Sequence, residues 1–122
     1  MKKFRFENLE IWQRAVEVAR KLFRLADILE EKKLYRFADQ LRGAGISMPN
    51  NIAEGSGSTS KKEFSQFLNI ARRSTFENAS MVLVFAKDDL ISEDMKNEIV
   101  QDLDELCRMI TSFSRSLKVN KE

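Results

Sequence analysis

Apolar residues recur at steps of three and four along almost the whole of this 122-residue chain. This spacing places side chains on one face of an α-helix, whereas a half-buried β-strand requires alternation at every second residue. The chain has only four glycines and one proline, too few for the frequent turns of a β-sandwich. The pattern therefore predicts an all-α protein.

The first two helices are expected at about residues 9–29 and 34–54. The apolar positions of the first are Leu9, Trp12, Val16, Ala19, Phe23, Ala26 and Leu29. Those of the second are Leu34, Phe37, Leu41, Gly45, Met48 and Ile52. Asn8 is a candidate N-cap for the first helix, because its side-chain oxygen can accept a bond from a free helical N–H group.

Pro49 makes the second helix unusual, because proline lacks an N–H donor and its ring presses on the carbonyl four residues earlier, that of Gly45. Gly43 adds a further cost on the order of 1 kcal/mol relative to alanine. We expect a kink between Gly45 and Pro49, which Gly45 accommodates because it lacks a Cβ atom. A complete break, which would give five helices, is the alternative.

The segment 55–60, GSGSTS, is the clearest loop of the chain. Gly55 is expected at the C′ position that ends the second helix. Ser60 and Glu63 have the spacing of a capping box, which opens a third helix that extends to about residue 88. The residues that recur at helical spacing on one face of this helix are Phe64, Phe67, Leu68, Ala71, Thr75, Asn78, Val82 and Phe85.

Ser92 is the expected N-cap of a fourth helix, whose first turn places Glu93 and Asp94 near the positive end of the helix dipole. Its apolar positions are Met95, Ile99, Leu103, Leu106, Ile110, Phe113 and Leu117. Four long amphipathic helices joined by short connections favour an up-down-up-down four-helix bundle, with residues 1–122 as a single domain.

Positive charge is concentrated in the first part of the chain. Residues 1–75 contain 15 Lys and Arg against 9 Asp and Glu, a balance of +6, whereas residues 76–122 contain 6 against 10, a balance of −4. One interpretation is attraction between pairs of helices, within the bundle or between subunits. The other is phosphate binding by basic residues of the first two helices. The candidate nucleic-acid-binding residues are Arg14, Lys21, Arg24, Arg36 and Arg42.

A weakly charged row on the second helix is a candidate contact surface, within the bundle or between subunits, with an ordinary polar flank as the alternative. The row consists of Gln40, Ala44, Ser47, Asn51 and Glu54. Glu54 stands near a helix C-terminus, where the dipole disfavours an anion. We expect it to accept from N–H groups at the start of the third helix or to pair with Arg72 or Arg73. Subunit or ligand contact is the alternative for Glu54, and Glu77 is a further contact candidate.

The sequence contains no histidine, which removes the commonest general base and the usual partner of serine and cysteine nucleophiles. A zinc site would have to use one cysteine and carboxylates alone, so we predict no metal and no other cofactor. Cys107 is expected to pack beside the apolar face of the fourth helix. Only the carboxylates of Glu54, Glu63 and Glu77 remain for acid–base chemistry, and we predict that the chain is not an enzyme.

A single cysteine excludes an intrachain disulfide and favours a reducing compartment. The segment 1–15 lacks the uninterrupted apolar region and the small-residue cleavage site of a signal peptide. No segment approaches the ~20 apolar residues of a membrane span. We expect a cytoplasmic protein without membrane association.

Several segments resemble one known family. They are FENLEIWQRA at 6–15, QLRGA at 40–44, NNIAEGSGS at 50–58 and EFSQFLNIARRS at 63–74, followed by Glu77. These segments are similar to the four-helix-bundle proteins encoded within intervening sequences of bacterial 23S ribosomal RNA genes. The resemblance extends through residue 85, and its most specific part is the NIAEG motif with LxxWQ upstream.

The resemblance implies a bundle that assembles into a ring, a homopentamer. The family also includes proteins similar to the accessory variability determinant of diversity-generating retroelements, which bind nucleic acid and a reverse transcriptase. We therefore expect a non-catalytic oligomeric protein that binds RNA or DNA, with a reverse transcriptase as a further partner by resemblance. A structural or protein–protein interaction scaffold is the alternative.

The chain departs from the family pattern at several positions. It has Gly43 and Ser58 where members usually have arginine, and Arg73 where they commonly have glycine. A Leu-Glu pair of the family is replaced by Asn78 and Ala79. The lost arginines lower the positive charge that the resemblance implies, and the lost Leu-Glu pair alters the packing expected of the third helix.

Overall fold

The computed structural model describes residues 3–119, which form four long helices preceded by a short 3-10 helix. The bounds are η1 Arg5–Asn8, α1 Glu10–Glu31, α2 Tyr35–Ser56, α3 Lys61–Lys87 and α4 Glu93–Val119. No β-strand occurs in this part of the chain, which confirms the all-α prediction. Within the same residues, no helix is both long and apolar enough to span a membrane.

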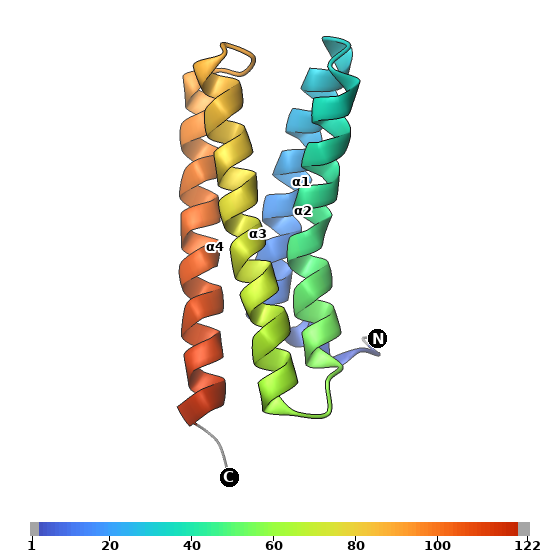
Figure 1. Ribbon diagram of the computed structural model, residues 1–122, viewed down its shortest axis with the longest axis vertical. Coiled ribbons are helices and arrows are strands. Elements are labelled where there is room, and N and C mark those ends of the chain that lie inside the picture. Colours follow the sequence, from blue (N-terminus) through green and yellow to red (C-terminus); the bar gives the residue numbers. More distant parts are fainter. Residues whose placement is uncertain (1–2, 120–122) are drawn as a thin grey trace.

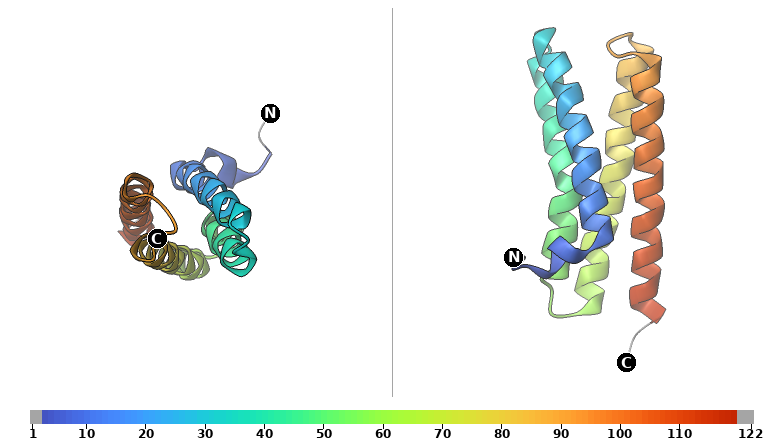
Figure 2. Two further views of the ribbon diagram at one scale, coloured as in Figure 1. Left: turned by 90° about the horizontal axis from the view of Figure 1, so that it is seen from above. Right: turned by 180° about the vertical axis from the view of Figure 1, so that it is seen from behind.

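The four helices form an up-down-up-down bundle, in which the first and last helices bring both chain ends to the same end of the molecule (Figure 1). Helices that are consecutive in the chain pack side by side, and α4 returns to α1 to close the bundle. The α1–α4 contact is the least extensive of the four. Figure 2 accordingly shows α1 with α2 as one pair and α3 with α4 as the other.

Serine residues begin α3 and α4, as the sequence predicts. The Ser60 Oγ atom accepts from the N–H group of Glu63 at 3.1 Å, which forms the serine half of the predicted capping box. The Ser92 Oγ atom accepts from the N–H group of Met95 at 3.1 Å. Each bond satisfies a helical donor that would otherwise lack a partner.

The start of α1 differs from the prediction, because Leu9 and not Asn8 occupies the N-cap position. Asn8 belongs instead to η1, where the Leu9 N–H group donates to the Phe6 carbonyl at 2.9 Å. The Gln13 side chain holds this extra turn against the helix by donating to the Glu7 carbonyl at 2.8 Å. The prediction for Asn8 is wrong because a further turn precedes the helix.

The core contains apolar side chains from all four helices. The largest fully buried ones are Leu22, Leu25, Leu29, Leu41, Met48, Ile52, Leu68, Leu103, Leu106, Ile110, Val18 and Val82. On α1, the expected positions Trp12, Val16 and Phe23 are only half-buried and flank this core. Phe37 of α2 is 39% exposed and lies against Phe85, with ring centroids 5.4 Å apart. The helix spacing was therefore right, but the apolar face of α1 is rotated from the one expected.

The second helix continues through Pro49, which is buried, to its end at Ser56. The five-helix alternative is therefore wrong. Neighbouring turns and packing hold the segment helical even though one backbone donor is missing. The kink between Gly45 and Pro49 stays a prediction.

Gly55 lies inside α2, so its prediction as a C′ residue is also wrong. A Cβ atom at this position would lie 2.8 Å from the Cδ1 atom of Phe64 and 2.8 Å from the Cβ atom of Phe67. Both neighbours belong to α3. Glycine is required here because α2 and α3 approach each other closely, and not because the chain turns.

Two connections instead use a left-handed residue that is not glycine. Lys33 follows α1 with φ 66°, and Asp89 follows α3 with φ 59°. After Lys33, the Leu34 N–H group donates to the Leu29 carbonyl at 3.0 Å, and the corresponding bond after Asp89 is 2.9 Å long. This spacing is that of the Schellman motif, which satisfies carbonyl groups at a helix end.

Candidate nucleic-acid interface

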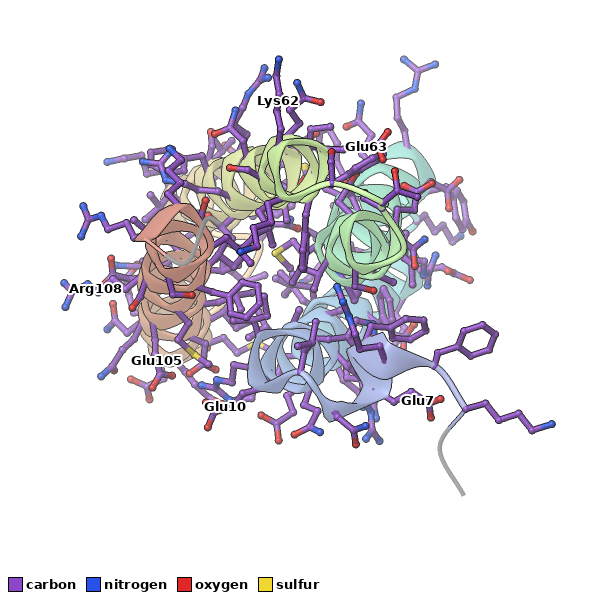
Figure 3. All side chains as sticks on the ribbon, turned by 90° about the horizontal axis from the view of Figure 1, so that it is seen from below. Glu7, Glu10, Lys62, Glu63, Glu105 and Arg108 are labelled. Carbon is purple, nitrogen blue, oxygen red and sulfur yellow. The ribbon has the colours of Figure 1, made fainter. Side chains whose placement is uncertain are left out.

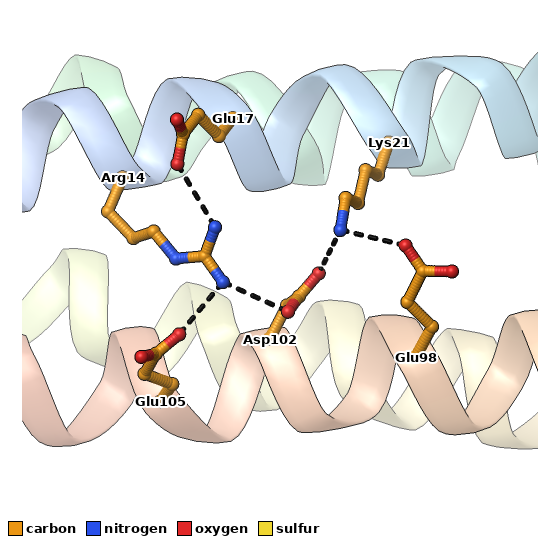
Figure 4. A network of polar contacts seen from close by, with 6 residues as sticks. All are labelled: Arg14, Glu17, Lys21, Glu98, Asp102 and Glu105. Atoms are coloured by element: carbon orange, nitrogen blue, oxygen red, sulfur yellow. Dashed lines mark hydrogen bonds and ion pairs between the residues drawn. The ribbon is translucent and has the colours of Figure 1, made fainter.

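Two of the predicted nucleic-acid-binding residues, Arg14 and Lys21, extend from α1 toward α4 (Figure 4). The Arg14 guanidinium donates to Asp102 at 2.9 Å and to Glu105 at 2.8 Å on α4. It also donates to Glu17 on its own helix at 3.0 Å. The pKa of Arg14 is raised, first by the bond with Glu17 and then, against the opposing effect of burial, by the bond with Glu105.

Lys21 completes the same network. Its ammonium group lies 2.6 Å from Asp102 and 2.8 Å from Glu98. The hydrogen bond with Asp102, followed by that with Glu98, raises the pKa of Lys21. Asp102, whose side chain is only 14% exposed, therefore joins Lys21 to Arg14. These positive charges of α1 are directed toward the carboxylates of α4, so attraction between helices operates inside the bundle.

A third predicted residue, Arg42 of α2, pairs with α1. Its Nη2 atom lies 2.6 Å from Glu30 and 2.9 Å from Asp27, and the bond with Asp27, followed by that with Glu30, raises the pKa of Arg42. Arg24 and Arg36 are exposed and form no ion pair within residues 3–119. The chain itself therefore neutralises three of the five predicted cations.

The middle of the predicted α2 contact row packs against α3 inside the bundle. The hydroxyl groups of Ser47 and Ser74 lie 2.9 Å apart, and the Asn51 amide donates to the Ser47 carbonyl at 2.8 Å. Asn78, which is fully buried, donates to the carbonyl groups of Ala44 and Ser74, both at 2.8 Å. This polar layer sets the position of α2 along α3, because a sliding of either helix would break its bonds.

The ends of the row face solvent instead. Gln40 and Glu54 are exposed, as is Glu77 of α3. The Glu54 carboxylate has no hydrogen bond or ion pair with any residue of the described range 3–119, so the prediction that it pairs with Arg72 or Arg73 is wrong. The predicted bond from the start of α3 is also not formed, since a serine already caps that helix.

The three carboxylates considered for acid–base chemistry do not come together. Glu63 and Glu77 lie on one helix, and the fourteen steps from residue 63 to residue 77 rise about 21 Å at 1.5 Å per residue. Glu54 lies on the neighbouring helix α2. A general acid and a general base must both reach one substrate, and this spacing does not allow all three to do so.

A cationic groove that the sequence did not predict lies between α3 and α4, at the end of the bundle where α3 begins. Two hollows of about 610 and 240 Å³ form it and share Ser65, Asn69 and Lys118. The lining cations are Lys61, Lys62, Arg72, Arg115 and Lys118. The lining hydroxyl and amide side chains are Ser65, Gln66, Asn69, Thr111 and Ser114. Among the described residues that line the two hollows, none has a carboxylate.

Figure 3 views the bundle from this end and shows how charge is separated. Lys62 points outward from α3, whereas Glu63 is directed toward α2. Glu7 and Glu10 lie on the opposite side of the bundle, beside α1. Glu63, Glu7 and Glu10 are therefore turned away from the cationic groove.

The cationic groove has polar groups beside the apolar lining residues Leu68, Ile110 and Leu117. The hydroxyl groups of Ser65 and Ser114 lie 3.3 Å apart and connect α3 to α4. The Thr111 hydroxyl donates to the Cys107 carbonyl at 2.9 Å, so its oxygen can still accept. Arginine, lysine, hydroxyl and amide groups are the donors that proteins use for phosphate oxygens, and all four kinds line this groove.

Two acid-free stretches of the sequence provide the signal for this groove. Residues 64–76 contain Arg72 and Arg73 and no Asp or Glu, and residues 106–119 contain three cations and no Asp or Glu. The second stretch lies within residues 76–122, whose net charge is −4, so the net charge of that region does not reveal a local cluster of cations. Antiparallel packing of α3 and α4 places the two stretches side by side.

Comparisons with known proteins agree with the family resemblance. A family model described as 23S rRNA-intervening sequence protein matches residues 7–112. The chain is also similar to a protein of unknown function from the S23 ribosomal protein family, from Bacteroides thetaiotaomicron, whose crystal structure is known. The two are 23% identical, with a TM-score of 0.81 and coverage of 85% of this chain and 97% of that chain. This likeness shows the fold, and no curated protein matches significantly.

Proposed function

Since this chain belongs to the 23S rRNA-intervening sequence protein family, we propose that it is a non-catalytic helical-bundle protein that binds RNA or DNA. Its phosphate-binding site is the cationic groove between α3 and α4. The observation that supports this proposal is that the lining residues in the described part of the chain include five cations and no carboxylate. Phosphate contacts require positive charge and donors but no sequence motif.

The location differs from the helices first considered. Arg14, Lys21 and Arg42 already pair with carboxylates of the chain, and a phosphate would have to displace these partners. Lys62, Arg115 and Lys118 of the groove, by contrast, form no ion pair within residues 3–119. Binding there releases counterions from the nucleic acid at little cost to the bundle.

The experiment is a fluorescence-anisotropy titration of a labelled oligonucleotide at about 50 and 200 mM salt. We expect affinity to fall steeply with salt. The combined change Lys62→Ala, Arg115→Ala and Lys118→Ala should weaken binding at low salt by at least about tenfold. It should also reduce the slope of log affinity against log salt by about 2, since each single-strand phosphate contact contributes about 0.7.

A matched control removes the same charge elsewhere. Arg20, Arg24 and Arg36 are exposed and form no ion pair within residues 3–119, and their combined change to alanine should alter affinity by less than about threefold. Binding that is absent at low salt, or that does not vary with salt, contradicts the proposal. A larger loss in the control than in the groove variant places the site on α1 and α2 instead.

A protein-interaction scaffold is the second candidate, and one observation favours it. Ile46 of α2 and Ile70 of α3 are 43% and 42% exposed, and the exposed residues Gln40 and Gly43 leave part of α2 uncharged. Exposed apolar side chains between polar ones are common at subunit contacts. Under this proposal the chain self-associates, and a ring of five copies is the state that sedimentation velocity should detect at micromolar concentration.

A further inference from the structure

The seam between α3 and α4 has a second half, which is apolar. A hollow of about 450 Å³ continues along it, toward the end of the bundle where α4 begins. Its lining residues are Thr75, Phe76, Ala79, Ser80, Leu83, Val84, Lys87, Val100, Leu103, Asp104 and Cys107. Phe76, Leu83 and Val84 are 59%, 40% and 57% exposed. We refer to this hollow as the apolar groove.

Arg72 and Phe76 connect the two halves of the seam. Arg72 lines the cationic groove, and Phe76 lines the apolar groove one helical turn later. The Arg72 guanidinium lies 5.2 Å from the centroid of the Phe76 ring. A cation over an aromatic face at this distance is attracted to it, so the pair forms a continuous surface with charge on one side and an exposed ring on the other.

The apolar groove is also compatible with a negatively charged ligand. Asp104 has the one carboxylate among its lining residues, and this carboxylate is paired with Arg108 at 3.0 Å. Lys87 stands at the far end of the groove. A chain of phosphates that extends from the cationic groove past Phe76 would therefore not meet an unpaired anion along the lining.

We propose that the α3–α4 seam binds a single strand of nucleic acid, with phosphates along the cationic groove and a base stacked on Phe76. This inference rests on the proposed function and adds the substrate class to it. A duplex exposes its phosphates but keeps its base faces stacked inside, so it can use the cationic groove alone. A single strand presents both groups, and aromatic side chains beside a cationic groove are the usual means of binding one.

A second copy of the chain accounts for less of this surface. It would cover the apolar residues, as subunit contacts do, but it would supply no opposite charge to Lys62, Arg115 and Lys118, which form no ion pair within residues 3–119. A strand of alternating phosphates and aromatic bases uses the cationic groove, the Arg72–Phe76 pair and the apolar groove together. Charge complementarity therefore favours the single strand.

The test compares a labelled single strand with a duplex of the same length by anisotropy, at low salt. We expect Phe76→Ala to weaken single-strand binding by about 5- to 150-fold, which is the range measured for base–aromatic stacking, and to leave duplex binding within about twofold. Phe76→Trp should restore single-strand binding, because the ring is exposed and the indole also stacks. The exposed position allows either variant to fold.

Cys107 gives a second readout on the unmodified chain. It is the only cysteine of the sequence and lines the apolar groove, where it is half-buried. A bound single strand should slow its alkylation by a thiol reagent at least about fivefold under saturating conditions. A duplex should give no such protection, and raising the salt until the strand dissociates should restore the original rate.

The outcomes separate this inference from the proposed function. One outcome is that both nucleic acids bind in a salt-dependent way that Phe76→Ala does not change. That result overturns the single-strand inference and leaves phosphate binding in place. No salt-dependent binding of either form overturns both. If Cys107 becomes protected as protein concentration alone increases, and Phe76→Ala lowers the sedimentation coefficient, a second copy occupies the apolar groove and the single-strand inference is wrong.

Discussion

The ammonium nitrogen of Lys21 lies 2.6 Å from the Oδ2 atom of Asp102, across the seam where α1 and α4 make the least extensive contact of the bundle. An ion pair therefore joins the two helices whose contact is the least extensive. Asp102 also accepts from Arg14 at 2.9 Å. Charge therefore joins helices at the α1–α4 seam, whereas the described residues that line the cationic groove between α3 and α4 include cations and no carboxylate.

The first prediction concerns Asp102→Asn, which keeps the shape of the side chain and removes its charge. Asp102 is 14% exposed and serves two cations, so we expect the free energy of unfolding to fall by about 1–3 kcal/mol in urea titrations. Glu98→Gln is the control, because that carboxylate is 62% exposed and should contribute less than about 1 kcal/mol. Equal stability of Asp102→Asn and the unmodified chain would contradict a structural role for the network.

The second prediction is alkaline destabilisation through Lys21. Its pKa is raised in the folded state, first by the hydrogen bond with Asp102 and then by that with Glu98. The stabilisation is therefore fully present below the ordinary lysine value of about 10.4 and is lost as pH rises through the higher folded pKa. As pH rises above about 10.4, the thermal midpoint of the unmodified chain should fall further than that of Lys21→Met. Parallel declines would show that this lysine is not linked to folding.

The third prediction separates two glycines of α2. Gly55→Ala should lower the free energy of unfolding by about 1–3 kcal/mol, because the new Cβ atom would lie 2.8 Å from the Phe64 ring and from the Phe67 Cβ atom. Gly43→Ala should raise it by about 0.5–1 kcal/mol, since nothing lies within 4 Å of that position and alanine favours a helix. Chemical denaturation of both variants measures these changes. The free energy of unfolding should fall for Gly55→Ala and rise for Gly43→Ala.

The fourth prediction concerns the left-handed residue after α1. Lys33 adopts φ 66°, which costs an L-residue about 1 kcal/mol and glycine almost nothing. Lys33→Gly should therefore raise the free energy of unfolding by about 0.5–1 kcal/mol in a urea titration. Lys32→Gly should not, because Lys32 has φ −84°, a conformation that other residues adopt readily.

The sequence by itself determined the number of helices and two of their starts. The apolar repeat and the caps Ser60 and Ser92 are local signals, which depend on residues within one or two turns. The family could be recognised for the same reason, since its motifs are short contiguous segments. Two predictions for α1 were wrong, namely Asn8 as its N-cap and the direction of its apolar face. Local signals do not determine these features, because both depend on how α1 packs against the rest of the chain.

Tertiary structure decided the rest, because interhelical distance and register are not encoded in the spacing of one helix. Gly55 is a residue type typical of turns, but here it allows α2 to pack closely against Phe64. The left-handed conformations after the helices are adopted by Lys33 and Asp89 instead. The candidate site moved for a similar reason. Arg14 and Lys21 contact an α4 carboxylate 88 and 81 residues away in the sequence, whereas two acid-free stretches become one groove only when α3 and α4 lie antiparallel.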